Sequence, residues 1–470
     1  MSNKNKWHFS DAGHGPYPGF NNSGIDMFRN KNSLYREVLQ NAGDNPASEN
    51  IPVTVIFKKV SIKTSNFGLN NEFVSILNNC KQWAQNQDKD DVQEFYKNAV
   101  KLVKQEKVDV LLVSDYNTKG LYKHPSNHQS NYFRLIVSPG SSKKSGDGGG
   151  SHGHGQHAAY AKSALRTVFF QSYIENKITD TEHKRLFVGK TILNSWKKPE
   201  ENITYIPTGF YGKVEDKYIM PFFDNEIPKS ISDIRNKTGT DIMILAPKDF
   251  GDMWTYSAQS EVVSHFFAAI NDSKLIIELN KKNSVNRIDK ETLDDFVKSS
   301  QNLRVANYLK ALRQNDPELI FTKDIEDLGK VEIRIDRHEK GNQSIVLLRK
   351  PRMKILEYNK PILSNYSGVI IIDDINGNDV IRNLEDGEHK KLEKDRLPPG
   401  KNYIEDLEKF IDETLLELCK TQVDEKIYIQ GLGSLLPSDE DMQRDGENNS
   451  DSEEEDTISQ PEKIEVQFNG

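Results

Sequence analysis

The feature that most constrains this chain is a short amphipathic stretch near its start, LYREVLQNAGDN at residues 34–45. Residues three or four apart share one face of a helix, so Glu37, Asn41 and Asp44 form a single polar stripe. The apolar contacts come from the rest of the stretch: Leu34, Tyr35, Val38, Leu39 and Ala42. Two interpretations are open: a solvated helix face, or a site where Asn41 offers an oxygen ligand to a metal and Glu37 acts as a general base.

The composition indicates a soluble chain with room for more than one domain. It has 470 residues, of which 35% are hydrophobic and 29% charged, and it contains no uninterrupted apolar run of the ~18 residues that a membrane span needs. The N-terminus lacks the apolar core of a secretory signal. Cys80 and Cys419 are the only cysteines and lie far apart, which suits a reducing compartment. We therefore expect a cytoplasmic protein with no membrane association.

The net charge of −8 comes from the C-terminal end. Residues 437–470 hold 12 Asp and Glu against 2 Lys and Arg, a balance of −10, so the body carries −8 minus −10, or +2. This end is too acidic and too poor in apolar groups to fold alone, and we expect a disordered tail. A body this close to neutral is not a basic DNA-binding surface.

The hydrophobic patterns predict a mixed α+β chain. An irregular arm is expected over residues 1–23. Helices are expected at about 25–43, 71–87, 90–105, 158–171, 256–270 and 403–421. Strands are expected at 51–62, 108–115, 183–193, 201–212, 240–247, 273–279, 330–336, 344–356 and 366–373.

One predicted strand, VDVLLVSD, ends in Asp115 at a turn that continues through Asn117 to Gly120. A carboxylate in this position could reach an adenine amino group, while the loop passes close beneath the base. Aspartate is also common in turns that bind nothing, so ordinary turn chemistry is the alternative.

A glycine-rich stretch, GDGGGSHGHGQHAAYAKSAL, precedes a predicted helix. Glycines allow backbone N–H groups to approach a phosphate, and a helix N-terminus favours an anion. The stretch is not a Walker A loop, and no strand leads into it as the dinucleotide-binding fingerprint requires. We expect a lid over phosphates, with a flexible linker as the alternative. The histidines of this stretch, which could suggest a metal site but have only Asp147 as a nearby acid, are His152, His154 and His157.

A later stretch, TGTDIMIL, places Gly239 and Thr240 at the start of a strand. A hydroxyl at Thr240 could bond a buried carboxylate and a base nitrogen. The alternative is a β-prone threonine that simply opens a strand.

Taken together, these motifs resemble, in order and chemistry, those of the Bergerat-fold (GHKL) ATPases, the family of gyrase, histidine kinases, the large heat-shock chaperones, MutL and MORC proteins. The resemblance implies that ATP and Mg²⁺ bind, that Glu37 activates the attacking water, and that Asn41 holds Mg²⁺. Asp115 would bind adenine with support from Thr240. The remaining nucleotide-binding positions that it implies are Asp44, Asn117, Gly120, Gly150, Gly153, Gly155 and Gln156.

The sequence departs from the family pattern in two places. The turn after Asp115 has one residue more than the usual spacing before Gly120, with Asn117 able to adopt the left-handed conformation. Gln156 stands where related bacterial proteins often carry a lysine, and slow turnover would follow if that lysine contacts phosphate.

The resemblance also implies the domain organisation, with a Bergerat-type α/β sandwich over residues 24–252 and a transducer-like α+β domain over residues 253–436. Transducers of this class supply a lysine to the γ-phosphate, and Lys350 is the candidate, with a solvated basic turn as the alternative. Stretches of the chain resemble MutL/MORC-like ATPases of restriction-like or anti-phage gene clusters.

The expected function is an ATP-driven switch or clamp that dimerises when ATP binds and works with a protein partner, in DNA transactions or anti-phage defence. A nucleotide-sensing scaffold with little or no hydrolysis is the alternative. A histidine kinase is disfavoured because too little chain precedes Glu37 for a dimerisation hairpin. A nuclease in the second domain, which would use Asp373 and Asp374, lacks a clear E-x-K partner.

Overall fold

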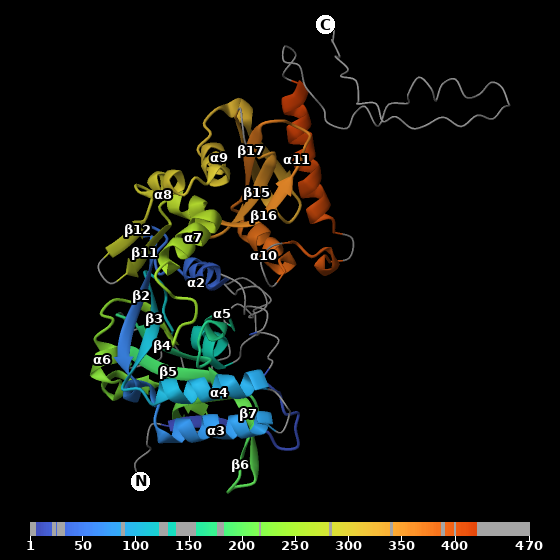
Figure 1. Ribbon diagram of the computed structural model, residues 1–470. Helices are drawn as coiled ribbons and strands as arrows, with labels where there is room; N and C mark the ends of the chain where they lie inside the picture. Colours follow the sequence, from blue (N-terminus) through green and yellow to red (C-terminus); the bar gives the residue numbers. More distant parts are fainter. Residues whose placement is uncertain are drawn as a thin grey trace, which may run out of the picture.

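The computed structural model shows a mixed α+β protein built around two β-sheets (Figure 1), which confirms the expected fold class. The structure describes the following residues: 6–20, 25, 33–85, 90–121, 130–137, 157–175, 183–215, 218–281, 284–338, 342–386, 391–398 and 401–420. The tail at 437–470 lies outside this description.

The first sheet has 12 strands among the described residues, in the order β1-β7-β5-β4-β10-β3-β2-β11-β12, with β6, β8 and β9 paired beside this path. All its pairs are antiparallel except β11 with β2. The strands are β1 (Lys6–Asp11), β2 (Val53–Lys63), β3 (Lys107–Tyr116), β4 (Thr167–Tyr173), β5 (Arg185–Ile192), β6 (Trp196–Lys198), β7 (Ile203–Glu215), β8 (Tyr218–Met220), β9 (Phe222–Phe223), β10 (Gly239–Leu245), β11 (Leu275–Lys281) and β12 (Ser284–Ile288).

Helices cover both faces of the first sheet and so enclose two cores. On one face, α3 and α4 bury Phe73 and Tyr96 against sheet residues such as Phe169. On the other face, α2, α5 and α7 share a core with Val55 and Phe170. The helices of this part are α2 (Ser33–Gly43), α3 (Asn71–Gln85), α4 (Asp90–Val103), a π-helical turn (Phe133–Val137), α5 (His157–Ala161), α6 (Lys229–Ser232) and α7 (Trp254–Asn271).

The N-terminal segment is irregular at residues 12–20, as the sequence predicts, but not at Lys6–Asp11, where β1 pairs with β7. Trp7 is buried, and its indole N–H donates to the carbonyl of Gly68 at 3.1 Å. Farther along, Arg166 lies 3.4 Å over the ring of Phe20. The segment therefore belongs to the body of its own chain.

The helix expected at 158–171 is also wrong for most of its length. The helix α5 ends at Ala161, and β4 begins at Thr167. Five of the seven residues of β4, TVFFQSY, are β-branched or aromatic, and almost all seven are buried, as is usual for a strand inside a sheet covered on both faces.

The second sheet has the order β13-β14-β17-β15-β16 in the described part of the chain. The helix α9 packs on one face, and α11 covers the other. Its elements are α8 (Leu293–Ser299), α9 (Leu303–Leu312), β13 (Ile320–Ile325), β14 (Gly329–Arg337), β15 (Ser344–Arg349), β16 (Met353–Asn359), β17 (Tyr366–Ile372), α10 (Ile375–Leu384) and α11 (Tyr403–Lys420).

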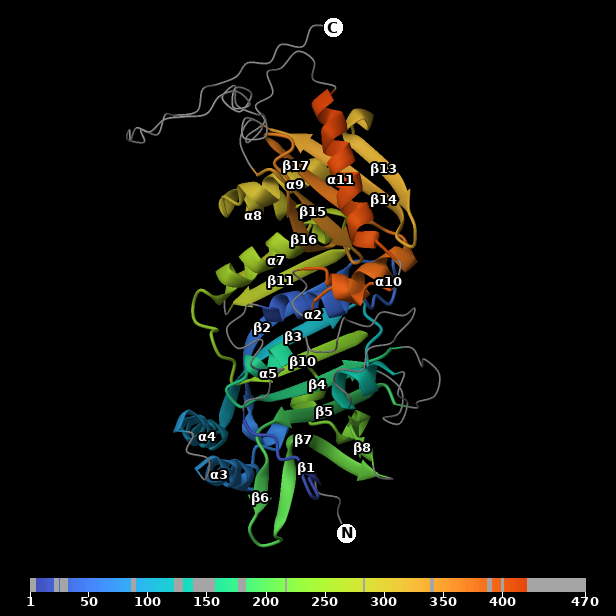
Figure 2. The same cartoon turned by 90° about the vertical axis from the view of Figure 1, so that its right-hand side faces the viewer.

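The two sheets meet across a continuous core at α2 and α7, which lie between them in both views (Figures 1 and 2). Phe267 of α7 is buried in the same cluster as Leu39 of α2 and Leu348 of β15. The strands β11 and β12 extend the first sheet to Ile288. The boundary expected at residue 252 therefore falls inside the first sheet, because β11 pairs with β2 although it follows α7 in the chain.

Candidate functional site

The polar stripe on α2 is mostly buried. Glu37 is 6% exposed and Gln40 is 1% exposed, and the side chain of Asp44 is 3% exposed. Only Asn41 faces outward as an exposed residue. A solvated helix face is therefore the wrong interpretation for Glu37 and Asp44, since burying carboxylates is costly unless charges or hydrogen bonds compensate.

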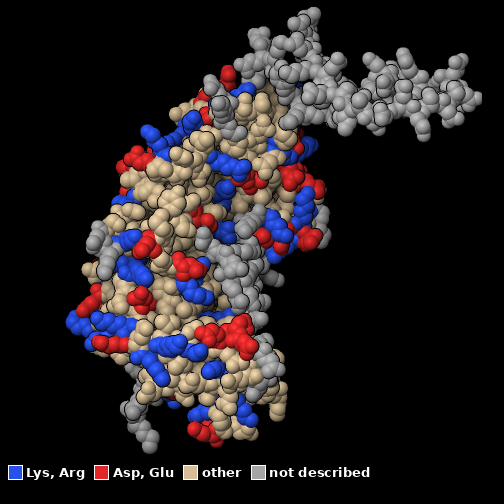
Figure 3. All heavy atoms as spheres, viewed as in Figure 1, with Lys and Arg blue, Asp and Glu red and all other residues tan. Residues whose placement is uncertain are grey.

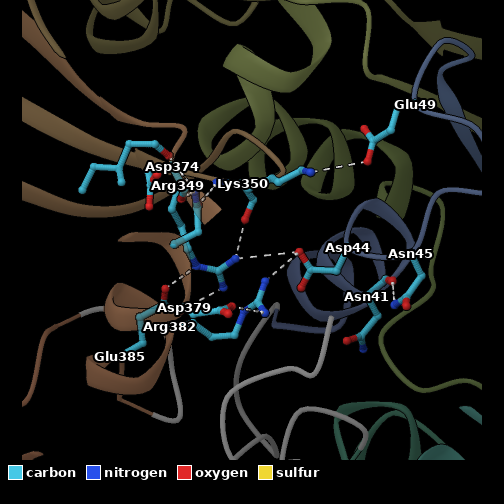
Figure 4. Close-up of polar contacts among 12 residues, drawn as sticks. Asn41, Asp44, Asn45, Glu49, Arg349, Lys350, Asp374, Asp379, Arg382 and Glu385 are labelled. Atoms are coloured by element: carbon cyan, nitrogen blue, oxygen red, sulfur yellow. Dashed lines mark hydrogen bonds and ion pairs between the residues drawn. The ribbon is translucent and has the colours of Figure 1, made fainter. Parts of the chain in front are cut away.

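Asp44 is covered by two arginines from the second sheet and its helix (Figure 4). The Nη1 atom of Arg349, at the end of β15, lies 3.8 Å from Asp44 Oδ1. The Nη2 atom of Arg382, on α10, lies 3.6 Å from the same oxygen. The acidic end of α2 therefore faces two guanidinium groups that the second half of the chain supplies.

Arg349 is completely buried and also pairs with Glu385, which is buried too. Its Nη2 donates to Glu385 Oε2 at 3.1 Å, and its Nε donates to the other oxygen of that carboxylate. Burial alone would lower the pKa of Arg349, but the carboxylates of Glu385, Asp44 and Glu37 outweigh it and raise the pKa. Arg349 is thus held in its charged form.

Lys350, the residue expected to contact phosphate, lies elsewhere. Its ammonium is 3.4 Å from Glu49 Oε1, and its side chain is 54% exposed. Figure 4 shows it pointing toward Glu49 rather than toward Asp44. The neighbouring Arg349, which the sequence analysis did not select, is the cation that reaches the polar face of α2.

At the other end of the candidate site, the strand β3 delivers Asp115 to the start of β10. Asp115 Oδ1 accepts a hydrogen bond from the backbone N–H of Thr240 at 2.7 Å and a second from the hydroxyl of Thr118. Burial raises the pKa of Asp115, and the nearby Arg235 guanidinium opposes that shift. The sequence predicts a bond from the Thr240 hydroxyl, whereas the bond comes from its backbone.

Gly239 makes this close approach possible. Its φ is +145°, and a Cβ added there would lie 2.3 Å from the carbonyl oxygen of Asp115. Neither the conformation nor the space suits a side chain. Gly239 is therefore needed so that the backbone can bring the N–H of Thr240 to the carboxylate of Asp115.

The turn after Asp115 is tied to the loop that follows α2. Asn117 has a φ of 58°, as expected for a residue that tolerates the left-handed region. Its side-chain amide donates to the carbonyls of Ser48 at 2.9 Å and Ile51 at 2.6 Å. Two backbone bonds add to this connection, namely Ala47 N–H to Asn117 O at 2.8 Å and Lys119 N–H to Asn45 O at 3.1 Å. The two halves of the site are therefore joined through these loops.

Gly120 closes the turn with a φ of +68°, and a Cβ there would lie 2.8 Å from the hydroxyl oxygen of Ser172. That hydroxyl accepts from the N–H of Leu121 at 2.8 Å and donates to the carbonyl of Gly239 at 2.8 Å. Glycine at position 120 is thus required by packing against β4, beside Asp115.

The expected lid lies outside the described residues, including Gly150, Gly153, Gly155 and Gln156. The same holds for His152 and His154. The next described residue is His157, where α5 begins, and the helix α5 contacts α2. The positions that the resemblance assigns to the lid therefore stay predictions.

Several polar groups around α2 escaped the sequence analysis. Buried atoms that have no hydrogen-bond partner among the described residues include Arg36 Nε, Gln40 Oε1, Tyr160 Oη and Arg382 Nε. Arg36 and Gln40 lie on α2 itself, Tyr160 on the neighbouring α5. Buried polar groups in proteins nearly always have partners, so each of these atoms keeps hydrogen-bonding capacity that its described neighbours do not use. The positions of Arg36 and Gln40 beside Glu37 could have been found from helical periodicity.

Lys190 is a further buried charge on this face of the first sheet. It pairs in register with Val168, which pairs with Ile244, four residues along β10 from Thr240. Its ammonium donates to the carbonyl of Ile136 at 2.7 Å. Burial lowers the pKa of Lys190 to about 7.

The acids considered for a nuclease have structural roles. Asp373 forms an ion pair with Arg352 at 2.7 Å. Asp374 caps α10 by accepting from the N–H of Gly377 at 2.9 Å. In the described part of the chain, no group of three or more His, Cys, Asp or Glu side chains is arranged to hold a metal ion.

No protein-family model matches the chain, and no curated protein matches it. Among solved structures, a similar one is the B-subunit of the DNA gyrase from Myxococcus xanthus. It is 9% identical, with a TM-score of 0.37, over 83% of this chain and 90% of that chain. A likeness at this level says nothing about what this chain does. Within the described residues, no helix combines the length and the apolar character needed to cross a membrane.

Proposed function

We propose that this protein is a Mg²⁺-dependent ATP hydrolase of the Bergerat type, which acts as a switch or clamp. The observation that carries the proposal is the buried polar face of α2, with Glu37, Gln40 and Asp44 shielded from solvent and tied by the loops at Asn45 and Asn117 to the Asp115 turn. An adenine contact and a phosphate-facing helix are thereby held in one unit. The sequence resemblance supports the same assignment.

The donor set fits Mg²⁺ bound together with ATP. Mg²⁺ usually takes one or two protein oxygens and completes its coordination with water and substrate phosphates. The side-chain oxygens of Asn41 and Asp44 suit such partial coordination, whereas the described residues hold no full set of protein ligands. Bound Mg²⁺ would neutralise charge on the phosphates.

The protein residues then have separate roles. Asp115 would accept a hydrogen bond from the adenine amino group. Burial raises the pKa of Asp115, and the nearby Arg235 guanidinium opposes that shift and so favours the ionised form that accepts. Glu37 would accept a proton from the attacking water. The orphaned Gln40 and Arg36 atoms would meet the polar parts of the ligand. Exclusion of bulk water follows from the burial of this face of α2.

The test compares ATP binding and phosphate release by the wild type and Glu37→Gln, which keeps the size of the side chain but removes the base. A general base typically contributes ~10²–10⁴-fold to rate, so we expect that loss in phosphate release with ATP affinity retained. Normal turnover by Glu37→Gln would remove Glu37 from this role. ATP binding without phosphate release by the wild type would favour the nucleotide-sensing scaffold.

Dimerisation on ATP binding, a partner from a multi-gene system and a role in DNA transactions or anti-phage defence belong to the same proposal. They rest on the resemblance to MutL/MORC-like ATPases. On the face seen in Figure 3, Lys and Arg are interspersed with Asp and Glu, so DNA contact needs a direct test. Adding duplex DNA to the phosphate-release assay provides it, with stimulation as the expected result for a clamp.

A further inference from the structure

The charge cluster between α2 and α10 has firm contacts on one side and looser ones on the other. Within the second half of the chain, Arg349 and Glu385 form a two-point hydrogen-bonded pair. Across the junction, Asp44 Oδ1 lies 3.8 Å from Arg349 Nη1 and 3.6 Å from Arg382 Nη2. Those two separations are longer than the hydrogen bonds that charged groups usually form.

The helix α10 is anchored firmly to its own sheet. Asn378 donates to the carbonyl of Ile372 at 2.9 Å and accepts from the N–H of Lys350 at 2.6 Å. Asp374 caps the start of the helix. Arg382 and Glu385 are therefore positioned by the second sheet, whereas Asp44 is positioned by α2.

Asp44 is consequently shared between two competing roles. Its carboxylate faces the arginines of the second sheet, and it also lies on the polar stripe where the proposed Mg²⁺–ATP site is located. Each guanidinium also has a closer carboxylate of its own, Glu385 for Arg349 and Asp379, at 3.3 Å, for Arg382. The two guanidinium groups still weaken the attraction of Asp44 for a cation, since each nearby positive charge repels that cation. The buried setting strengthens both interactions because screening by water is weak there.

We propose that Asp44 couples cation binding at α2 to the docking of α10, with Arg382 and Arg349 as positioning residues that act through Asp44. A Mg²⁺ ion bound with the nucleotide would attract the Asp44 carboxylate, and the electrostatic attraction between α2 and α10 would then weaken. Because such coupling is reciprocal, loss of the Arg382 charge strengthens Mg²⁺ binding. This inference rests on the proposed ATP site.

The first experiment measures ATP affinity with and without Mg²⁺ by titration for the wild type, Arg382→Gln and Arg382→Lys. The quantity compared is the ATP affinity with Mg²⁺ divided by the ATP affinity without it. We expect this ratio to rise about fivefold or more in Arg382→Gln and to stay near the wild-type value in Arg382→Lys. A purely structural role would not change this ratio. The matched control is Lys323→Gln, which removes an exposed pair with Glu413 at 2.7 Å and should leave the ratio unchanged. An unchanged ratio in Arg382→Gln with ATP still bound would overturn the coupling.

The second experiment needs no nucleotide. Hydrogen exchange of α10 is compared between the wild type and Asp44→Asn, which removes the α2 carboxylate beside Arg382 and keeps Asp379, which lies 3.3 Å from Arg382 within α10. Faster exchange in α10 of the variant supports the coupling, and equal exchange overturns it. If the wild type bound no ATP under any condition, the proposed function would fail, while this measurement would still decide whether α2 holds α10.

Discussion

Two regions of the molecule bury charge in opposite ways. On the face of the first sheet, Asp115 and Lys190 are satisfied mainly by neutral groups, namely the N–H of Thr240 and the carbonyl of Ile136. At the junction of the two sheets, Arg349 is satisfied by carboxylates.

The pKa shifts follow this difference. Burial raises the pKa of Asp115 and lowers that of Lys190 to about 7, so both move toward their neutral forms. The pKa of Arg349 is raised because its carboxylate partners outweigh burial, so it moves toward its charged form. The first region is thus built within one sheet, while the second depends on how the two sheets dock.

The largest loss of folding stability is expected from Arg349→Met. This change takes the Arg349 guanidinium away from the buried Glu385, and breaking a buried ion pair from one side costs about 3–5 kcal/mol. Denaturant unfolding monitored by circular dichroism measures the loss. The matched double variant Arg349→Met with Glu385→Met removes both charges and should recover much of the stability. A double variant no more stable than the single one would show that the pair does not act as a unit.

A smaller loss of folding stability is expected from Gly239→Ala, which tests the region around Asp115 on the first sheet. The added Cβ would meet the backbone of Asp115 at 2.3 Å, in a conformation with a φ of +145°. Backbone strain of this kind costs about 1–3 kcal/mol, and displacement of Thr240 should also weaken ATP binding. Gly251→Ala is the control, because no atom lies within 4 Å of an added Cβ there. Equal stability of the two variants would contradict the close approach of β10 to Asp115.

Lys190→Met tests the buried charge of the first sheet through the pH dependence of unfolding. Between about pH 7, the folded pKa of Lys190, and the ordinary lysine value of about 10.4, the unfolded chain binds a proton that the folded chain does not. The free energy of unfolding of the wild type therefore rises with pH in this window, relative to Lys190→Met, by at most about 1.4 kcal/mol per pH unit. Unfolding measured from pH 6.5 to pH 9 should reveal this slope. The control is Lys197→Met at an exposed position, whose free energy of unfolding should follow that of the wild type across this pH range.

The sequence predicts the elements that hold the site better than the contacts between them. The β-branched runs of β2, β3 and β10 and the periodicity of α2 place Glu37, Asp44 and Asp115 in their elements. The pairing of Asp44 with Arg349 is not predictable in this way, because it joins residues about 300 positions apart across two sheets. The sequence favours Lys350 over Arg349 by the chemistry expected of a transducer, yet it does not show which of two adjacent side chains turns inward at the end of a strand.

The smallest change in stability and ATP affinity is expected from Lys350→Gln, which tests whether Lys350 or Arg349 is the cation that acts at α2. The pair of Lys350 with Glu49 is exposed, and such surface pairs contribute about 0–1 kcal/mol. If Arg349 is the cation that matters at α2, Lys350→Gln should alter neither unfolding nor ATP affinity by more than a small amount. A loss of ATP affinity of about tenfold, or about 1.4 kcal/mol, would mean that Lys350 leaves Glu49 to contact the nucleotide. The surface pair would then be a resting position, and Lys350 would be the phosphate contact that the sequence resemblance implies.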